Sequence, residues 1–222
     1  MYTTRDVALV SLAIAILVAG CGSLFQQNIS TDSPPVALGE DGLILGSVTA
    51  PPVYYHETLA FHYRSVGDGG KTSGLITSAT TMASIITKVP QCDEDGLADQ
   101  CGRLFAIRLP AGEYEIYAVN EMEPGANHYQ LPPLGFAVAK GRASYLGNLH
   151  TLFCEGLVRS TRGAILGGDL SVRDEYDRDV ALLRAKYPQL AEASIDKQLL
   201  PDRAWRWRVK YEPYDWGTCV SK

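Results

Sequence analysis

The feature that most constrains the fold is a period-two alternation of apolar and polar residues in short runs. Apolar side chains occupy every second position from Phe105 to Leu109, and after a Pro-Ala-Gly turn the alternation resumes from Tyr114 to Ala118. Residues two apart lie on one face of a strand, so this pattern buries one face of a sheet and leaves the other in solvent. It predicts two strands joined by a tight turn.

Further strands are expected on the same grounds along most of the chain after residue 42. They cover 42–48, 59–63, 136–138, 145–153 and 205–211. The composition agrees, because the 21 Gly and 12 Pro punctuate turns and the 12 Tyr favour strands.

One amphipathic helix is expected near the C-terminus. Its apolar stripe consists of Tyr176, Val180, Leu183 and Tyr187. Spacings of three and four place these side chains on one helical face. Asp174 is the expected N-cap, Pro188 ends the helix, and 191–200 is expected to add a second short helix. The predicted fold is therefore mainly β, an antiparallel β-sandwich with a helical insertion around 174–200.

The N-terminus has the layout of a secretory signal. An apolar run from Val7 to Val18 follows Arg5 and Asp6. The run is shorter than the roughly 20 apolar residues of a membrane-spanning helix. The ending Val-Ala-Gly-Cys at Cys21 resembles the lipobox of bacterial lipoproteins.

That resemblance implies that the signal 1–20 is removed and that Cys21 carries lipid. Each buried CH₂ contributes about 0.8 kcal/mol, so several acyl chains on one residue would anchor the protein to a membrane. Gly22 at the next position implies the outer membrane, facing the periplasm. Residues 21–40 are then the lipidated Cys and a polar, flexible tether, and 41–222 form the β-sandwich domain.

The other cysteines are Cys92, Cys101, Cys154 and Cys219. An even number in an oxidising compartment predicts two disulfides, for which three connectivities exist. Proximity favours Cys92–Cys101, with Cys154–Cys219 as the second bond. The chain has no Cys-x-x-Cys pair and its histidines are scattered, so no metal site is expected.

Several function classes are disfavoured. The net charge of -5 disfavours nucleic-acid binding, which needs a clustered basic surface. The segment 65–73, SVGDGGKTS, resembles a phosphate-binding loop, but Ser65 replaces its first Gly and the following residues favour a strand. A hairpin turn is the better interpretation, and neither nucleotide nor any other cofactor is expected.

An acidic segment near residue 95 has two interpretations. Asp93, Asp95 and Asp99 lie around Gly96, and oxygen-rich turns of this kind can hold calcium. The segment lacks the full calcium-loop spacing, so a solvated acidic turn closed by a disulfide is favoured.

Catalysis is not expected. His62 and His150 lie on alternating strands, where histidines usually sit at the surface or bond to a neighbour. Glu113 and Glu115 share one strand face, as paired glycosidase carboxylates would, but such a face is usually only the solvated one. No nucleophile elbow or metalloprotease motif occurs in the sequence.

The final strand offers a candidate partner surface. Trp205 and Trp207 alternate with Arg206, Arg208 and Lys210, so the aromatic face is expected in the core and the basic face outside. The basic residues would either contact an anionic partner or be neutralised by neighbouring acids such as Glu113 and Glu115. Trp216 is less constrained and would be free to stack on a sugar ring.

Two segments resemble a known family. RLFAIRLPAGEYEIYAV (103–119) is similar to the strand–turn–strand of transthyretin-like β-sandwiches, as in carboxypeptidase regulatory-like domains. FAVAKGRASYLGNL (136–149) resembles the next hairpin of small envelope lipoproteins of that type. This resemblance implies a domain that binds or supports other molecules and has no shared catalytic residues.

The expected function is therefore that of a non-enzymatic lipoprotein of the bacterial cell envelope that binds or supports another envelope component. The alternatives are a glycan- or peptidoglycan-binding module and, less favoured, a metal-assisted hydrolase. An exposed aromatic pair beside polar groups would favour the glycan module. A concave site joining His to Asp or Glu would favour the hydrolase, and a closed sandwich with neither would favour a supporting role.

Overall fold

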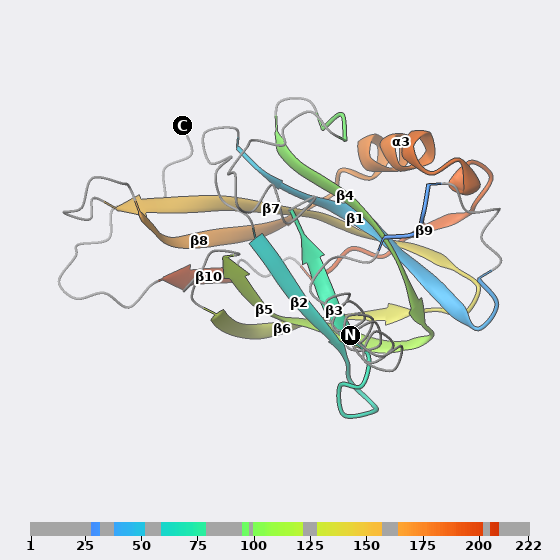
Figure 1. Ribbon diagram of the computed structural model, residues 1–222, viewed down its shortest axis with the longest axis horizontal. Coiled ribbons are helices and arrows are strands. Elements are labelled where there is room, and N and C mark those ends of the chain that lie inside the picture. Colours follow the sequence, from blue (N-terminus) through green and yellow to red (C-terminus); the bar gives the residue numbers. More distant parts are fainter. Residues whose placement is uncertain are drawn as a thin grey trace, which may run out of the picture.

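Two β-sheets packed face to face make up most of the structure (Figure 1). This computed structural model describes residues 28–31, 38–51, 59–78, 95–97, 100–121, 128–156, 164–201 and 205–208. The strands are β1 (Asp41–Ala50), β2 (Leu59–Ser65), β3 (Ser73–Thr77), β4 (Cys101–Pro110), β5 (Gly112–Glu121), β6 (His128–Val138), β7 (Ala143–Gly156), β8 (Ala164–Arg173), β9 (Ile195–Lys197) and β10 (Trp205–Arg208). The described part also contains one α-helix, α3 (Tyr176–Lys186).

The large sheet is six-stranded and has the order β10-β8-β7-β1-β4, with β9 also paired to β7. The small sheet is four-stranded, in the order β3-β2-β5-β6. Most pairs are antiparallel, as predicted, but β1 and β9 each run parallel to β7. The mainly β sandwich with a helix near the C-terminus is thus confirmed, with a mixed large sheet.

The main core lies between the two sheets, where the period-two pattern placed it. The small sheet contributes Phe61 and Ile116, and the large sheet contributes Ile44, Phe105 and Ile107. Each is at most 1% exposed. These side chains alternate along their strands with residues of the opposite face, so the hydrophobic alternation sets the register of the sandwich.

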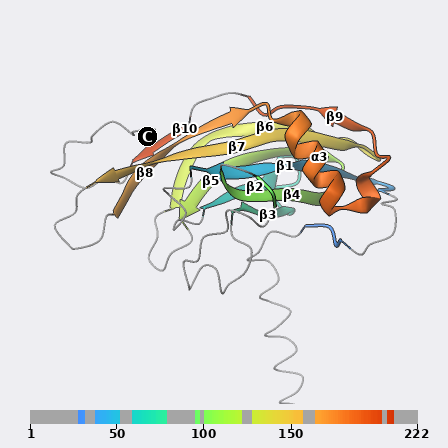
Figure 2. The same cartoon turned by 90° about the horizontal axis from the view of Figure 1, so that it is seen from above.

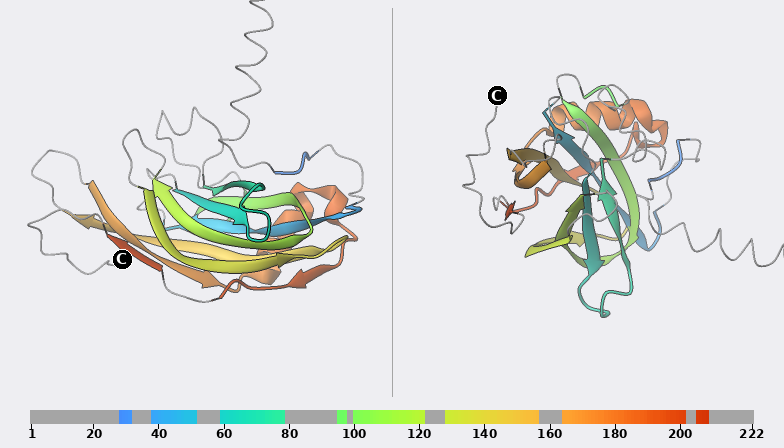
Figure 3. Two further views of the ribbon diagram at one scale, coloured as in Figure 1. Left: turned by 90° about the horizontal axis from the view of Figure 1, so that it is seen from below. Right: turned by 60° about the vertical axis from the view of Figure 1, so that its left-hand side comes forward.

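The large sheet is covered on its other face by α3. Leu43 and Leu45 of β1 pack with Val180 and Leu183 of the helix in a second cluster. Figure 3 shows α3 and the small sheet on opposite sides of the large sheet, and Figure 2 shows the helix lying across β1 and β4. The continuous apolar run of β1 follows from this arrangement, because both of its faces are buried.

The helix agrees with the sequence except at its ends. Its N-cap is Glu175 instead of Asp174, although Asp174 accepts a hydrogen bond from the Tyr176 amide at 3.4 Å. Pro188 begins a short 3-10 helix, η3 (Pro188–Leu190), and so stops α3 as expected.

The second helix expected over 191–200 is wrong. Residues 195–197 form β9, which pairs with the first residues of β7. The amides of Gln198 and Leu200 continue this pairing by donating to carbonyls of Tyr145 and Leu146, both at 2.9 Å. Hydrogen bonding to the open side of β7 outweighs the local helical preference of this segment. The side chain of Ile195 is buried in the same arrangement.

The expected tether is partly docked on the domain. Asn28 forms an isolated antiparallel bridge to Ile107 of β4, its side chain accepts from the Ala106 amide at 2.8 Å, and the Ile29 amide donates to the Ala106 carbonyl at 2.8 Å. Gln189 donates to the Ser30 carbonyl at 2.7 Å. Residues 28–30 of the expected tether are therefore hydrogen-bonded to the domain, whereas the expected signal 1–20 and Cys21 lie outside the described residues.

Candidate functional site

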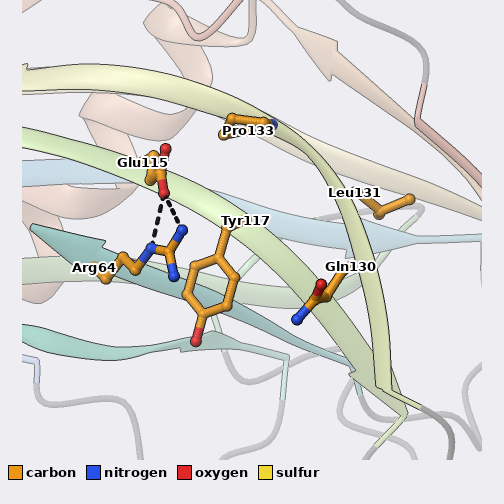
Figure 4. Close-up of a pocket in the computed structure, with 6 residues that line it drawn as sticks. All are labelled: Arg64, Glu115, Tyr117, Gln130, Leu131 and Pro133. Carbon is orange, nitrogen blue, oxygen red and sulfur yellow. Dashed lines mark hydrogen bonds and ion pairs between the residues drawn. The ribbon is translucent and has the colours of Figure 1, made fainter. Parts of the chain in front are cut away.

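A hollow of about 160 Å³ opens on the outer face of the small sheet (Figure 4). Strands β2, β5 and β6 line it. Its side chains are Arg64, Glu115, Tyr117, Gln130, Leu131 and Pro133. They combine a cation, an anion, an amide, an aromatic ring and apolar surface within one small space.

The hollow exists because β6 bulges opposite Tyr117. Ile116 pairs with Leu134, and the next pair is Ala118 with Gln130, so the bulged residues of β6 face a single residue of β5. The bulge contains Pro132 and Pro133, which have no amide hydrogen to donate to a ladder. The sequence LPPL therefore interrupts the pairing and separates the β6 side chains from β5 at this point.

The last described strand, β10, contacts the bulge from the core side of the small sheet. The indole N–H of Trp205 donates to the carbonyl of Pro132 at 2.8 Å. Trp205 is 2% exposed and belongs to the main core. Its predicted place in the core is thus confirmed, and the same side chain also supports the wall of the hollow.

An ion pair forms the opposite wall. Arg64 and Glu115 are register partners on β2 and β5, so their side chains share a face. Nε and Nη2 of Arg64 lie 2.7 and 2.6 Å from Oε1 of Glu115. The Arg64 guanidinium carbon lies 4.3 Å from the centre of the Tyr117 ring, a cation–π contact.

The pair leaves the hollow electrically neutral yet rich in hydrogen-bonding groups. The side chain of Arg64 is 48% exposed and that of Glu115 is 17% exposed. Tyr117 separates Arg64 from Gln130 in Figure 4, so donors and acceptors lie on both sides of the ring. Beside the hollow, His62 is hydrogen-bonded to Asn120 at 2.5 Å and packs edge-on against Tyr117 at 6.1 Å.

A second polar group of residues lies on the outer face of the large sheet, next to α3. In β7 the extra residue Gly147 has a φ of 113°, a left-handed value that favours glycine. The resulting bulge brings Asn148 and His150 to the same face as Ser47 and Thr49 of β1. All four are buried, with exposures between 0% and 3%.

These side chains form a continuous hydrogen-bonded chain. Asn148 donates to the hydroxyls of Ser47 at 2.6 Å and Thr49 at 2.9 Å, and Ser47 donates to Asp179 of α3 at 2.6 Å. Asp179 is fully buried and also accepts from Tyr145 at 2.8 Å and from Arg178 at 2.7 Å. Burial, and then the nearby Asp179, raise the pKa of Tyr145, so this hydroxyl stays a donor.

His150 lies at the end of this series of hydrogen-bonded side chains. Its Nδ1 lies 2.9 Å from the Thr49 hydroxyl. Burial, with smaller contributions from Arg173 and Arg178, lowers the pKa of His150 to about 4. The imidazole is therefore neutral near pH 7 and shielded from solvent, which agrees with the interpretation of His62 and His150 as histidines bonded to neighbours.

The acidic segment is not solvated at Asp95. Its carboxylate accepts from the Leu104 amide of β4 at 2.7 Å and is paired with Lys186 of α3. Asp95 is 8% exposed, so the expectation of a solvated turn is wrong for this residue. Asp93 and Asp99 lie outside the described residues, and within the described part no group of three metal-ligating side chains is gathered.

The segment 65–73 is the β2–β3 hairpin, as predicted. Asp68 accepts hydrogen bonds from the amides of Gly70 and Lys71, both at 3.1 Å, and from the Ser65 hydroxyl. These bonds lower the pKa of Asp68, with the Ser65 hydroxyl as the largest cause. The amides that a phosphate-binding loop would present are thus taken by a side chain of the turn itself.

Arg206, the one basic residue of this stripe whose side chain is described, faces an acid across the strand pair as expected, but the acid is a different one. Arg206 is exposed and lies 3.9 Å from Asp169, its register partner on β8. Glu113 and Glu115 are wrong as the neutralising acids for Arg206, because their strand β5 belongs to the other sheet and Glu115 is paired with Arg64. The side chains of Trp207 and Arg208, and residues Lys210 and Trp216, lie outside the described part.

Cys101 is disulfide-bonded at the start of β4. Cys92 and Cys219, and the side chain of Cys154, lie outside the described residues. The pairings Cys92–Cys101 and Cys154–Cys219 therefore stay predictions.

The sequence did not lead to the hollow, although it contains the signals. Alternation placed Glu115 on the outer face of its strand but gave no partner for it. The Pro pair at 132–133 inside an apolar run marked a break in the ladder. Only the pairing of β2 with β5 brings Arg64 to these residues.

Comparison with known proteins assigns no family. No protein-family model matches the chain, and no curated protein matches it. A leucine-rich repeat protein from Bacteroides thetaiotaomicron is similar in structure at 13% identity and a TM-score of 0.28. The match covers 52% of this chain and 14% of that chain. Among the described residues, no helix has the length and apolar character needed to span a membrane.

Proposed function

We propose that this chain is a lipid-anchored protein of the bacterial envelope whose β-sandwich binds another envelope component without performing chemistry on it. The hollow at Tyr117 carries the binding part of this proposal. It presents an exposed guanidinium, an amide and an aromatic ring on a rigid sheet face, which is a common composition for recognition sites. The transthyretin-like resemblance of the sequence points to the same class of domain.

The docked residues after Cys21 support a role close to the membrane. Cys21 precedes Asn28 by seven positions. A fully extended chain advances at most about 3.6 Å per residue, so a lipid on Cys21 would hold Asn28 within about 25 Å of the anchor. The domain would then reach a component near the membrane surface, and in the proposed outer-membrane location this surface faces the periplasm.

The anchor is tested by replacing Cys21 with Ser in the full chain and labelling cells with palmitate. We expect the wild-type chain to be labelled and to sediment with membranes, and the Cys21→Ser chain to lose the label. A variant that still carries palmitate would refute lipidation at Cys21.

The binding site is tested by placing a photo-cross-linking amino acid at Gln130, which is exposed in the hollow. The matched control is Asp177, which is exposed on α3 across the large sheet. We expect an adduct with an envelope component from position 130 and none of the same mass from position 177. Equal adducts from both positions, or none from either, would contradict a binding role for the hollow.

A further inference from the structure

The hollow has the size of a subsite for one unit of a larger ligand. Sites for drug-sized molecules have volumes of about 300–1,000 Å³, so the 160 Å³ here is well below that range. A single ring of a polymer fits this space, with the neighbouring units lying along the open sheet surface.

The charge of the hollow favours an uncharged ligand. The charge of Arg64 is neutralised by Glu115, whose Oε1 lies 2.6 Å from Nη2, so a phosphate or carboxylate would find no net positive charge in the hollow. The exposed Glu113 on the same strand face and the net charge of -5 also oppose a polyanion.

The hydrogen-bonding groups favour hydroxyls and amides over a peptide backbone. Arg64 donates, Glu115 accepts, and the side chains of Gln130 and Tyr117 do both. A ligand hydroxyl also both donates and accepts, so it can satisfy either kind of partner. The hollow lies on the face of paired strands β2, β5 and β6, where the ladder already uses the backbone groups that would bind an added peptide strand.

The remaining surface of the hollow matches the apolar side of a sugar ring. The Arg64 guanidinium covers one face of the Tyr117 ring, so the apolar surface offered to a ligand is the rest of that ring together with the aliphatic edges of Leu131 and Pro133. Tyrosine combines an apolar ring with a polar tip, which suits a ligand having C–H faces and hydroxyl edges.

From these observations we infer that the hollow is a subsite for one unit of a neutral saccharide, with Tyr117 as the platform and Arg64, Glu115 and Gln130 as the hydrogen-bonding groups. This inference rests on the proposed function, because it takes the hollow to be the binding site. It names the ligand class of that site.

The test uses the purified full chain, lipidated and kept in detergent micelles. The probes are a tetramer of N-acetylglucosamine, a glucose tetramer and a sulfated oligosaccharide of similar length. Saturation-transfer NMR and calorimetry measure binding at millimolar concentration. We expect binding of at least one neutral tetramer and weaker binding of the sulfated one.

Variants then locate the site. Tyr117→Ala and Gln130→Ala are each expected to weaken binding by about tenfold or more, whereas Tyr117→Phe keeps the platform and changes affinity by less than about threefold. The matched control for Arg64→Ala is Arg108→Ala. Arg108 of β4 is similarly exposed and is likewise paired with an acid, Asp41 of β1, at 2.7 Å. Arg64→Ala is expected to weaken binding and Arg108→Ala to leave it unchanged, with thermal unfolding confirming that each variant folds.

Three outcomes would overturn the inference. These are the absence of binding to both neutral tetramers, preferred binding of the sulfated probe, and binding that Tyr117→Ala and Gln130→Ala leave unchanged. If the cross-linker at Gln130 still captures an envelope component in the first or second case, the proposed binding role stands and only the saccharide assignment fails. If position 130 captures nothing either, both fail.

Discussion

The indole N–H of Trp205 donates to the carbonyl oxygen of Pro132 at 2.8 Å, and this bond ties the last described strand to the bulge that shapes the hollow. Pro132 is followed by Pro133, and neither residue has an amide hydrogen with which to continue the pairing of β6. A distant core residue therefore supports the wall of the candidate site, and changes at Trp205 are expected to affect both stability and binding.

The first prediction concerns this bond. Trp205→Phe keeps an aromatic ring in the core but removes the N–H, so the free energy of unfolding should fall by about 1–3 kcal/mol through lost packing and an unsatisfied carbonyl. Urea denaturation of the full chain measures this. The β6 bulge should also be held less firmly, so a cross-linker at Gln130 should give a lower yield of adduct with the envelope component. Unchanged stability would show that the bond contributes nothing.

The second prediction concerns the buried carboxylate of Asp179. Asp179→Ala leaves the hydroxyls of Ser47 and Tyr145 without their acceptor and Arg178 with only its longer contact to Glu175 at 3.6 Å, so the free energy of unfolding should fall by about 3–5 kcal/mol. Asp177→Ala is the matched control, because it removes an exposed carboxylate of the same helix and should cost less than about 1 kcal/mol. Equal costs in chemical denaturation would contradict a structural role for the buried chain.

The third prediction concerns pH. The pKa of His150 is lowered to about 4 in the folded chain, from an ordinary value of 6.5. The unfolded chain therefore binds more protons between these pH values, and the folded state loses stability as the pH falls through this window, by up to about 1.4 kcal/mol per pH unit. Above pH 6.5 the titration of His150 should not change the stability of the folded state with pH.

The measurement for His150 is the difference in unfolding free energy between the wild type and His150→Gln at pH 7.5, 6 and 5. Glutamine can still bond to Thr49 but does not titrate, so the variant should lose less stability between pH 7.5 and 5 than the wild type. Parallel pH profiles for the two proteins would rule out His150 as the cause.

The fourth prediction concerns the disulfides. Cys101 is bonded, and we expect non-reducing peptide mapping to find Cys92 as its partner and Cys154 bonded to Cys219. The second bond closes the longer loop and should contribute roughly 4 kcal/mol in the chain-entropy model, so its removal should destabilise the chain more. A peptide linking Cys101 to Cys154 or Cys219 would contradict both pairings.

The strands could be predicted because alternation is a local signal. Phe61, Phe105 and Ile116 were placed in the core by spacing alone, and all three lie between the sheets. The parallel pairing of β1 with β7 could not be predicted, because it joins segments far apart in sequence that carry no shared local pattern. The helix expected over 191–200 failed for the same reason, since the open side of β7 decides the conformation there.

The candidate site depended even more on tertiary pairing. Glu115 was recognised as an outward-facing carboxylate, but its partner Arg64 belongs to another strand, and the register of β2 against β5 alone brings them together. Asp95 was predicted to lie in a solvated turn because its segment lacks the full calcium-loop spacing, whereas Lys186 and the Leu104 amide reach it only in the folded chain.

The free edge of β4, the last strand of the large sheet, is partly covered by hydrogen bonds from other segments, which limits strand pairing between copies of this protein. In the lipid-anchored state proposed above, neighbouring copies would be confined to two dimensions and would collide often, and strands with open hydrogen-bonding groups can template aggregation. On β4 the outward amides of Leu104 and Ala106 are occupied by Asp95 and Asn28, and the Ala106 carbonyl is occupied by Ile29. Asn28, Ile29 and Asp95 thus make these three backbone groups of β4 unavailable for pairing with the same strand of another copy.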